Sequence, residues 1–191
     1  MILNLEKEKE NFKNHIATFT DCGNIKVIDF KKPKSSHYRI RFLFEEDYCR
    51  LHISGDLGQL IATNYNNMTL EGFSDFVHST GYFEQKIDSH DRPLYVYDYD
   101  LARKELIERL ADYDFTPEYD FETEDKLREE KIDEILENFS DRDGISERGY
   151  DALSEIDADC FEYVSYIGRE RTGILELYML AFELAYAQIF E

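Results

Sequence analysis

The sequence predicts an α+β fold in which a four-stranded antiparallel meander is covered by helices and followed by an acidic helical region. Residues 25–65 hold short β-branched and aromatic runs whose apolar side chains alternate. The segments on either side carry apolar residues at helical spacing, and the later ones are strongly acidic. With 191 residues, 42% of them hydrophobic, the chain can bury a sizeable core.

A helix is predicted at the amino terminus, where Asn4 can cap the first turn. Its apolar residues follow at near-helical spacing and are Leu5, Phe12, Ile16 and Phe19. Gly23 then supplies a stop, so this helix is expected to continue through residue 19.

Four strands are predicted next, in the runs IKVIDF, HYRIRFLF, YCRLHIS and QLIATNY. The segments between them are KKPKSS, EED and GDLG. Connections this short permit hairpins but no parallel crossover, so the sheet is expected to be antiparallel. Alternate residues of the second run share one face, which the first two helices are expected to cover.

Helical patterns dominate the rest of the chain. Thr69 can cap LEGFSDFVHST, and Asp98 or Asp100 can cap LARKELIERLADY. LYVYD, just before the second of these helices, fits a fifth strand, which the pattern leaves open. Three further helical segments read ETEDKLREEKIDEILENF, ISERGYDALSEID and TGILELYMLAFELAYAQIF. The last is apolar on nearly all faces, which predicts burial against other helices or at a partner.

Two parts are predicted from this pattern. Residues 1–97 form an α+β sheet domain, and residues 98–191 form an acidic helical subdomain packed on it. Most of the excess charge lies in the second part, because residues 98–165 hold 24 Asp and Glu against 8 Lys and Arg.

The net charge limits the classes of partner. The chain has 42 acidic and 22 basic residues, a formal charge of −20, which repels nucleic-acid phosphate. Such a charge suits solubility in high salt, cation binding or contact with a basic protein surface. Ordinary DNA or RNA binding is therefore disfavoured for the protein as a whole.

The stretch DYDFTPEYDFETED, residues 112–125, carries seven carboxylates, no basic residue and four aromatic rings. Rows of carboxylates on a rigid surface can approximate the phosphate array of a nucleic acid, and aromatic rings are favoured anchors at interfaces. The predicted partner-binding residues are Asp112, Tyr113, Asp114, Glu118, Tyr119, Asp120, Glu122, Glu124 and Asp125. The alternatives are a solvated acidic face whose rings close the core, and a cation-binding surface.

No catalytic residue, metal ligand or cofactor is predicted. The three cysteines lie outside any CxxC pair, and the five histidines form no HExxH motif. The loop SHDRP, residues 89–93, is interpreted as a turn rather than an acid–base cluster. A metal-dependent nuclease stays an alternative, which requires carboxylates to converge on one pocket.

The basic segment KKPK, residues 31–34, interrupts the acidic chain. Its favoured interpretation is a charged edge loop that discourages strand pairing, and the alternative is contact with RNA.

The run RFLFEEDYCRLHISGDLGQLIATNYNNMTLEGFSDFVHSTGYF resembles a segment of uncharacterised accessory proteins from bacterial phages and plasmids, some of which lie among anti-CRISPR genes. It covers about a quarter of the chain and carries no catalytic motif. The resemblance implies an inhibitor of a host defence nuclease such as Cas9. The basic segment KKPK leaves open a simultaneous contact with such a protein and its guide RNA.

Together with the acidic stretch, this predicts a non-enzymatic inhibitor that binds the basic nucleic-acid channel of the nuclease. A further alternative is a regulatory module that forms a homodimer through its last helix. The start of the chain lacks a secretory pattern and no apolar run is long enough to cross a membrane, so the expected location is the host cytoplasm.

Overall fold

The computed structural model describes residues 3–76, 78–115 and 123–191. They form two compact units. The sheet unit consists of Leu3–Leu94 and Thr172–Glu191, and the acidic unit is Tyr95–Arg171.

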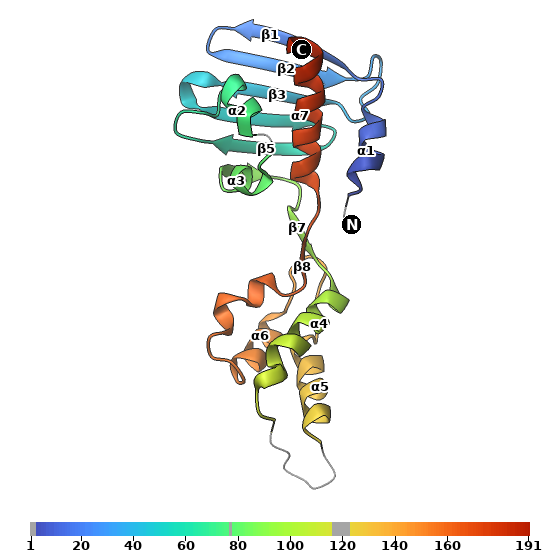
Figure 1. Ribbon diagram of the computed structural model, residues 1–191, viewed down its shortest axis with the longest axis vertical. Helices are drawn as coiled ribbons and strands as arrows, with labels where there is room; N and C mark the ends of the chain where they lie inside the picture. Colours follow the sequence, from blue (N-terminus) through green and yellow to red (C-terminus); the bar gives the residue numbers. More distant parts are fainter. Residues whose placement is uncertain (1–2, 77, 116–122) are drawn as a thin grey trace. The chain divides into compact units, whose positions relative to one another are not determined.

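The sheet unit is built on a six-stranded antiparallel sheet whose strand order follows the sequence (Figure 1). Its strands are β1 (Ile16–Cys22), β2 (Ile25–Lys31), β3 (Ile40–Glu45), β4 (Arg50–Gly55), β5 (Gly58–Thr63) and β6 (Ile87–His90). The predicted four-stranded meander is therefore wrong. β2 to β5 occupy the four predicted runs, but β1 and β6 extend the sheet by one strand at each edge.

β1 replaces the second half of the predicted amino-terminal helix. The helix α1 covers only Leu5–Asn11, with Asn4 as its cap. From Ile16 onward β-branched side chains alternate with others, a pattern that favours a strand, and every residue of β1 pairs with β2. Gly23, at φ +76°, forms the tight turn between the two strands rather than a helix stop.

The core of the sheet unit lies between the sheet and α7 (Ile174–Phe190), which crosses its inner face (Figure 1). Phe182 of α7 is fully buried, and its ring centroid lies 5.3 Å from that of Phe42 and 4.8 Å from that of Phe73. The main cover is thus α7 and not the first two helices. In the described residues, no helix combines the length and hydropathy that a membrane span requires.

Three shorter elements complete the sheet unit. They are η1 (Glu46–Tyr48), α2 (Leu70–Phe76) and α3 (Thr80–Glu84). The Thr69 hydroxyl accepts a hydrogen bond from the Gly72 N–H (3.1 Å), so Thr69 caps α2 as the sequence predicts.

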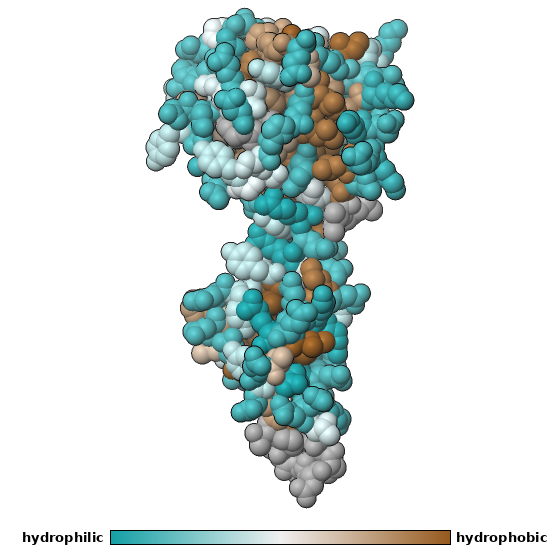
Figure 2. Space-filling view, viewed as in Figure 1, coloured by the Kyte–Doolittle hydropathy of each residue, from teal (hydrophilic) through white to brown (hydrophobic). Residues whose placement is uncertain are grey.

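The acidic unit begins and ends with a two-stranded antiparallel ladder of β7 (Tyr95–Tyr97) and β8 (Arg169–Arg171). LYVYD therefore contains a strand, although it pairs outside the six-stranded sheet. Between these strands lie α4 (Tyr99–Arg109), η2 (Leu110–Asp112), α5 (Glu124–Ile135), α6 (Glu147–Ser154), η3 (Cys160–Glu162) and η4 (Val164–Tyr166). Hydrophilic residues cover most of the visible face of this unit (Figure 2).

The acidic unit has its own core. Its fully buried side chains include Leu106 of α4, Ile132 and Ile135 of α5, and Leu153 of α6. A Cβ atom on Gly149 of α6 would lie 2.0 Å from the carbonyl oxygen of Ile135, so the missing side chain permits the close approach of α5 and α6.

Candidate acidic interaction surface

The structure describes five of the nine predicted partner-binding residues. Asp112 ends η2 and Asp114 follows it, and both side chains are exposed. Glu124 and Asp125 lie in the first turn of α5 and are exposed as well. Tyr113 is half-buried against the core of the acidic unit. The remaining four, Glu118, Tyr119, Asp120 and Glu122, lie outside the described residues.

Tyr113 is fixed to the body of the acidic unit by its hydroxyl group. Asp157 accepts a hydrogen bond from the Tyr163 hydroxyl (2.8 Å), and the Tyr113 hydroxyl interacts with the same carboxylate. The Tyr163 hydroxyl first and the Tyr113 hydroxyl second lower the pKa of the Asp157 carboxyl. Burial, followed by the same hydrogen bond to Asp157, raises the pKa of Tyr163. Tyr113 therefore supports the surface from inside rather than presenting a free ring to a partner.

Arg128 joins the two ends of the acidic stretch. Its guanidinium contacts the carboxylates of Glu124 (2.8 Å) and Asp125 (3.1 Å) at one end. At the other end it lies over the Phe115 ring, 5.3 Å from the centroid. The Arg128 side chain is only 18% exposed, whereas those of Glu124 and Asp125 are 51% and 91% exposed. The guanidinium therefore brings the two carboxylates together and leaves them accessible to solvent.

A row of carboxylates continues along α5. Asp125, Glu129 and Asp133 follow at every fourth residue, and all three are exposed. Four residues of α-helix rise about 6 Å. The phosphates of one duplex strand follow at about 3.4 Å of helix axis, so the row matches roughly every second phosphate.

The acidic unit has far more carboxylates than its own cations can neutralise. Tyr95–Arg171 contains 25 Asp and Glu against 10 Lys and Arg, a net charge of −15. Every one of those ten cations already pairs with a carboxylate or an aromatic ring of the same unit. The surplus negative charge is therefore available to an external cation.

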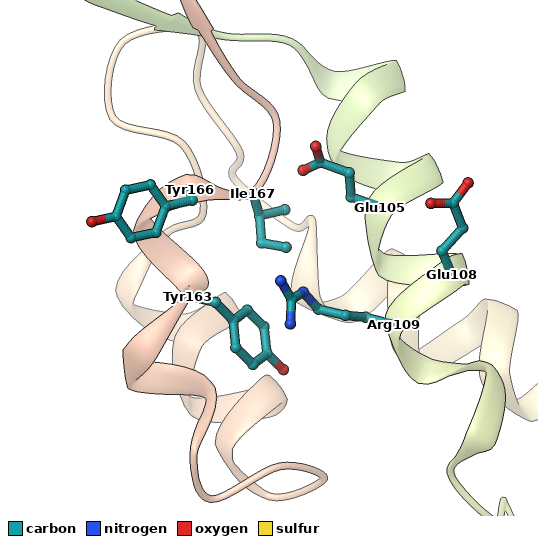
Figure 3. Close-up of a pocket in the computed structure, with 6 residues that line it drawn as sticks. All are labelled: Glu105, Glu108, Arg109, Tyr163, Tyr166 and Ile167. Carbon is teal, nitrogen blue, oxygen red and sulfur yellow. The ribbon is translucent and has the colours of Figure 1, made fainter. Parts of the chain in front are cut away.

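A recess of about 330 Å³ adds to this surface (Figure 3). Glu105, Glu108 and Arg109 line it from α4, and Tyr163 and Tyr166 line it from the opposite side. Glu105 accepts a hydrogen bond from the Gly168 N–H (2.7 Å), while Arg109 lies over the Tyr163 ring, 3.8 Å from its centroid. Carboxylates beside aromatic rings offer a lining suited to a cationic side chain.

Sequence reasoning missed these supporting residues for different reasons. Arg128 follows Glu124 by four residues and Asp125 by three, a spacing that brings helical side chains together. Its ion pairs with these carboxylates could therefore have been predicted from the sequence. Asp157 is distant in sequence from Tyr113, and only the fold brings them together. The i, i+3 spacing of Glu105 and Glu108 indicates a shared helix face but no recess.

The sequence left two catalytic possibilities, a metal site and the SHDRP loop. Nowhere in residues 3–76, 78–115 and 123–191 do three His, Cys, Asp or Glu side chains approach closely enough to hold a metal ion. In the SHDRP segment, Ser89 and His90 end β6, Asp91 accepts the Gln59 N–H (2.8 Å), and a His90 ring nitrogen lies 2.7 Å from the Arg92 carbonyl oxygen. No protein-family model, curated protein or solved structure matches the chain.

Proposed function

We propose that the acidic unit binds the basic nucleic-acid channel of a nuclease, and that the protein thereby inhibits a host defence nuclease of the Cas9 type. The observation that carries this proposal is the surplus charge of −15 in Tyr95–Arg171, where every cation is already engaged. The resemblance of residues 41–83 to phage and plasmid accessory proteins supports the choice of target class.

The mechanism follows from the placement of the carboxylates. Surplus negative charge attracts a basic channel at long range and accelerates the encounter. The row along α5 and the carboxylates held by Arg128 then occupy positions that phosphates would take. A nuclease whose channel is filled in this way cannot admit its target strand.

The competing functions lack a comparable observation. A metal-dependent nuclease needs converging carboxylates, which the described residues do not bring together. A module that dimerises through α7 needs a free apolar face on that helix. The eight buried side chains of α7 all belong to the core of the sheet unit instead.

Charge removal within the acidic stretch tests the proposal. The variant D114N/E118Q/D120N/E122Q keeps side-chain shape and removes four charges. We expect its inhibition of guide-loaded Cas9-type DNA cleavage to fall about tenfold or more, because charge complementarity controls the association rate. The measurement is the inhibitor concentration that halves cleavage, taken at 50 and 200 mM salt.

A matched control removes four exposed carboxylates from the sheet unit, in the variant E10Q/D47N/D75N/D88N. It should inhibit as well as the parent. An equal loss of inhibition in both variants would mean that only the overall charge matters. Undiminished inhibition by the first variant would exclude the acidic stretch as the inhibitory surface. If the parent binds no such nuclease, the inhibitor proposal fails.

A further inference from the structure

The hairpin that connects β2 to β3, residues 31–39, is the most basic feature of an acidic protein. Its cations are all exposed and are Lys31, Lys32, Lys34 and Arg39. His37 is exposed among them, and its ring centroid lies 4.7 Å from that of Tyr38. We call residues 31–39 the basic hairpin.

Edge protection does not account for these cations. β2 lies between β1 and β3, and β3 lies between β2 and β4. Both strands that carry the basic hairpin are therefore interior, with neighbours on each side. Lysine side chains discourage unwanted strand pairing when they lie on an edge strand, and the edge strand next to β2 is β1.

The hairpin cations have no internal partner either. Among the described residues, no carboxylate lies within salt-bridge distance of Lys31, Lys32, Lys34 or Arg39. Two nearby carboxylates are already used by the hairpin, since Glu8 accepts from the Tyr38 hydroxyl and Asp56 accepts from the Tyr38 N–H (2.9 Å). This pattern is the reverse of that in the acidic unit, where every cation is engaged.

Hydrogen bonds hold the backbone of the basic hairpin. The Asp56 N–H donates to the Arg39 carbonyl (2.8 Å), and the Ser35 N–H donates to the Lys32 carbonyl (3.2 Å). Lys34 (φ +59°) and Tyr38 (φ +58°) both adopt the left-handed conformation. Backbone of this kind in a non-glycine residue concentrates at binding sites, where the surrounding structure enforces it.

We propose that the basic hairpin binds the phosphate backbone of a nucleic acid strand. Lysine and arginine neutralise phosphates and release their counterions, and an exposed ring beside them can stack on a base. Lys31 follows the buried residue Phe30, and Arg39 precedes the buried residue Ile40, so strand alternation places both on the exposed face of the sheet.

The overall charge of −20 does not prevent this contact. Lys31, Lys32, Lys34 and Arg39 lie in the sheet unit, which has 17 acidic and 12 basic residues in Leu3–Leu94 and Thr172–Glu191, a net charge of −5. At physiological salt, exposed charges farther apart than about 8 Å are largely screened. A phosphate at the hairpin therefore responds mainly to the nearby cations.

Fluorescence anisotropy of the whole protein with a labelled single-stranded RNA tests the proposal, with no nuclease present. Four phosphate contacts predict a slope of about −2.8 for log affinity against log salt, a loss of roughly 50-fold between 50 and 200 mM. The variant K31Q/K32Q/K34Q should reduce that slope to about −0.7.

The control K7Q/K9Q/K86Q removes the same charge elsewhere on the sheet unit and should keep the parental slope. Equal slopes for the two variants, no RNA binding by the parent at 50 mM salt, or displacement of RNA by poly-glutamate as readily as by unlabelled RNA would overturn the proposal. Because the assay contains only protein and RNA, its outcome is independent of the nuclease inhibition proposed for the acidic unit.

Discussion

Asp157 organises the residues behind the acidic surface, because its carboxylate accepts a hydrogen bond from the Tyr163 hydroxyl and interacts with the Tyr113 hydroxyl. The sequence suggested Tyr113 as a partner-facing anchor. In the fold its hydroxyl is used internally, and the exposed groups beside it are Asp112 and Asp114. At the residue scale, the Tyr113 ring packs against the core of the acidic unit, and Asp112 and Asp114 beside it are exposed.

The replacement of Tyr163 by Phe tests this arrangement through its pH dependence. It removes one hydrogen bond to Asp157, and we expect the free energy of unfolding at pH 7 to fall by about 1 kcal/mol. The pKa of Asp157 is lowered in the folded protein. Its contribution is therefore present above the ordinary aspartate pKa of about 3.9 and is lost as the pH falls below it.

Urea unfolding followed by circular dichroism, from pH 7 to pH 3, measures the difference between parent and Tyr163→Phe. The difference should shrink toward the acidic end. Tyr166→Phe is the control, because the Tyr166 side chain is 59% exposed and its hydroxyl makes no hydrogen bond in the described chain. A difference that is independent of pH would mean that Tyr163 acts through packing alone.

At the element scale, local patterns determined some segments and not others. Period-two alternation located β2 to β5, and the capping residues Asn4, Thr69 and Asp98 each accept the expected backbone hydrogen bond. The Ile16–Cys22 segment was missed because its apolar residues also fit a helical spacing, and only pairing with β2 decides between the two. β6 has a single half-buried apolar residue, Ile87, and so carries almost no strand signal.

The sequence pattern also did not predict where α7 packs. Its apolar faces predicted burial, but the partner surface is a sheet whose strands precede it by more than eighty residues. Local periodicity does not specify such long-range pairing. Long-range contacts in the candidate site are equally hard to predict. Its carboxylates can be identified from the sequence, but the interactions of Asp157 with distant tyrosines cannot.

The contact between α5 and α6 gives an element-scale prediction. In Gly149→Ala the new Cβ would lie 2.0 Å from the Ile135 carbonyl oxygen, so the two helices must separate. We expect a loss of about 1–3 kcal/mol in the free energy of unfolding, typical of an overpacked interior. Urea unfolding of this variant and of Arg148→Ala makes the comparison.

Arg148 is an exposed neighbour on the same helix, so its replacement should change the free energy of unfolding by about 0.5 kcal/mol or less. An unhindered Gly→Ala change inside a helix stabilises by roughly 1 kcal/mol. A more stable Gly149→Ala protein would therefore show that the close contact between α5 and α6 is absent.

At the scale of the whole molecule, charge and core divide along the same boundary. The core of the sheet unit draws every buried side chain from Leu3–Leu94 and Thr172–Glu191, and the core of the acidic unit draws all of its own from Tyr95–Arg171. The formal charges of the two units, −5 and −15, account for the total of −20. The two proposed binding surfaces, one basic and one acidic, thus belong to units whose cores do not share residues.

Excision of the acidic unit tests this division and separates the two proposals. The Thr172 N–H donates to the Leu94 carbonyl (3.0 Å), so a short Gly-Ser linker can join these residues without displacing them. The shortened protein should unfold cooperatively with a β-rich circular dichroism spectrum, because its core is complete. It should bind RNA with the parental salt slope through the basic hairpin, yet no longer inhibit a Cas9-type nuclease. An unfolded product would show that the sheet core depends on Tyr95–Arg171, and a folded product that still inhibits would move the inhibitory surface from the acidic unit to the sheet unit.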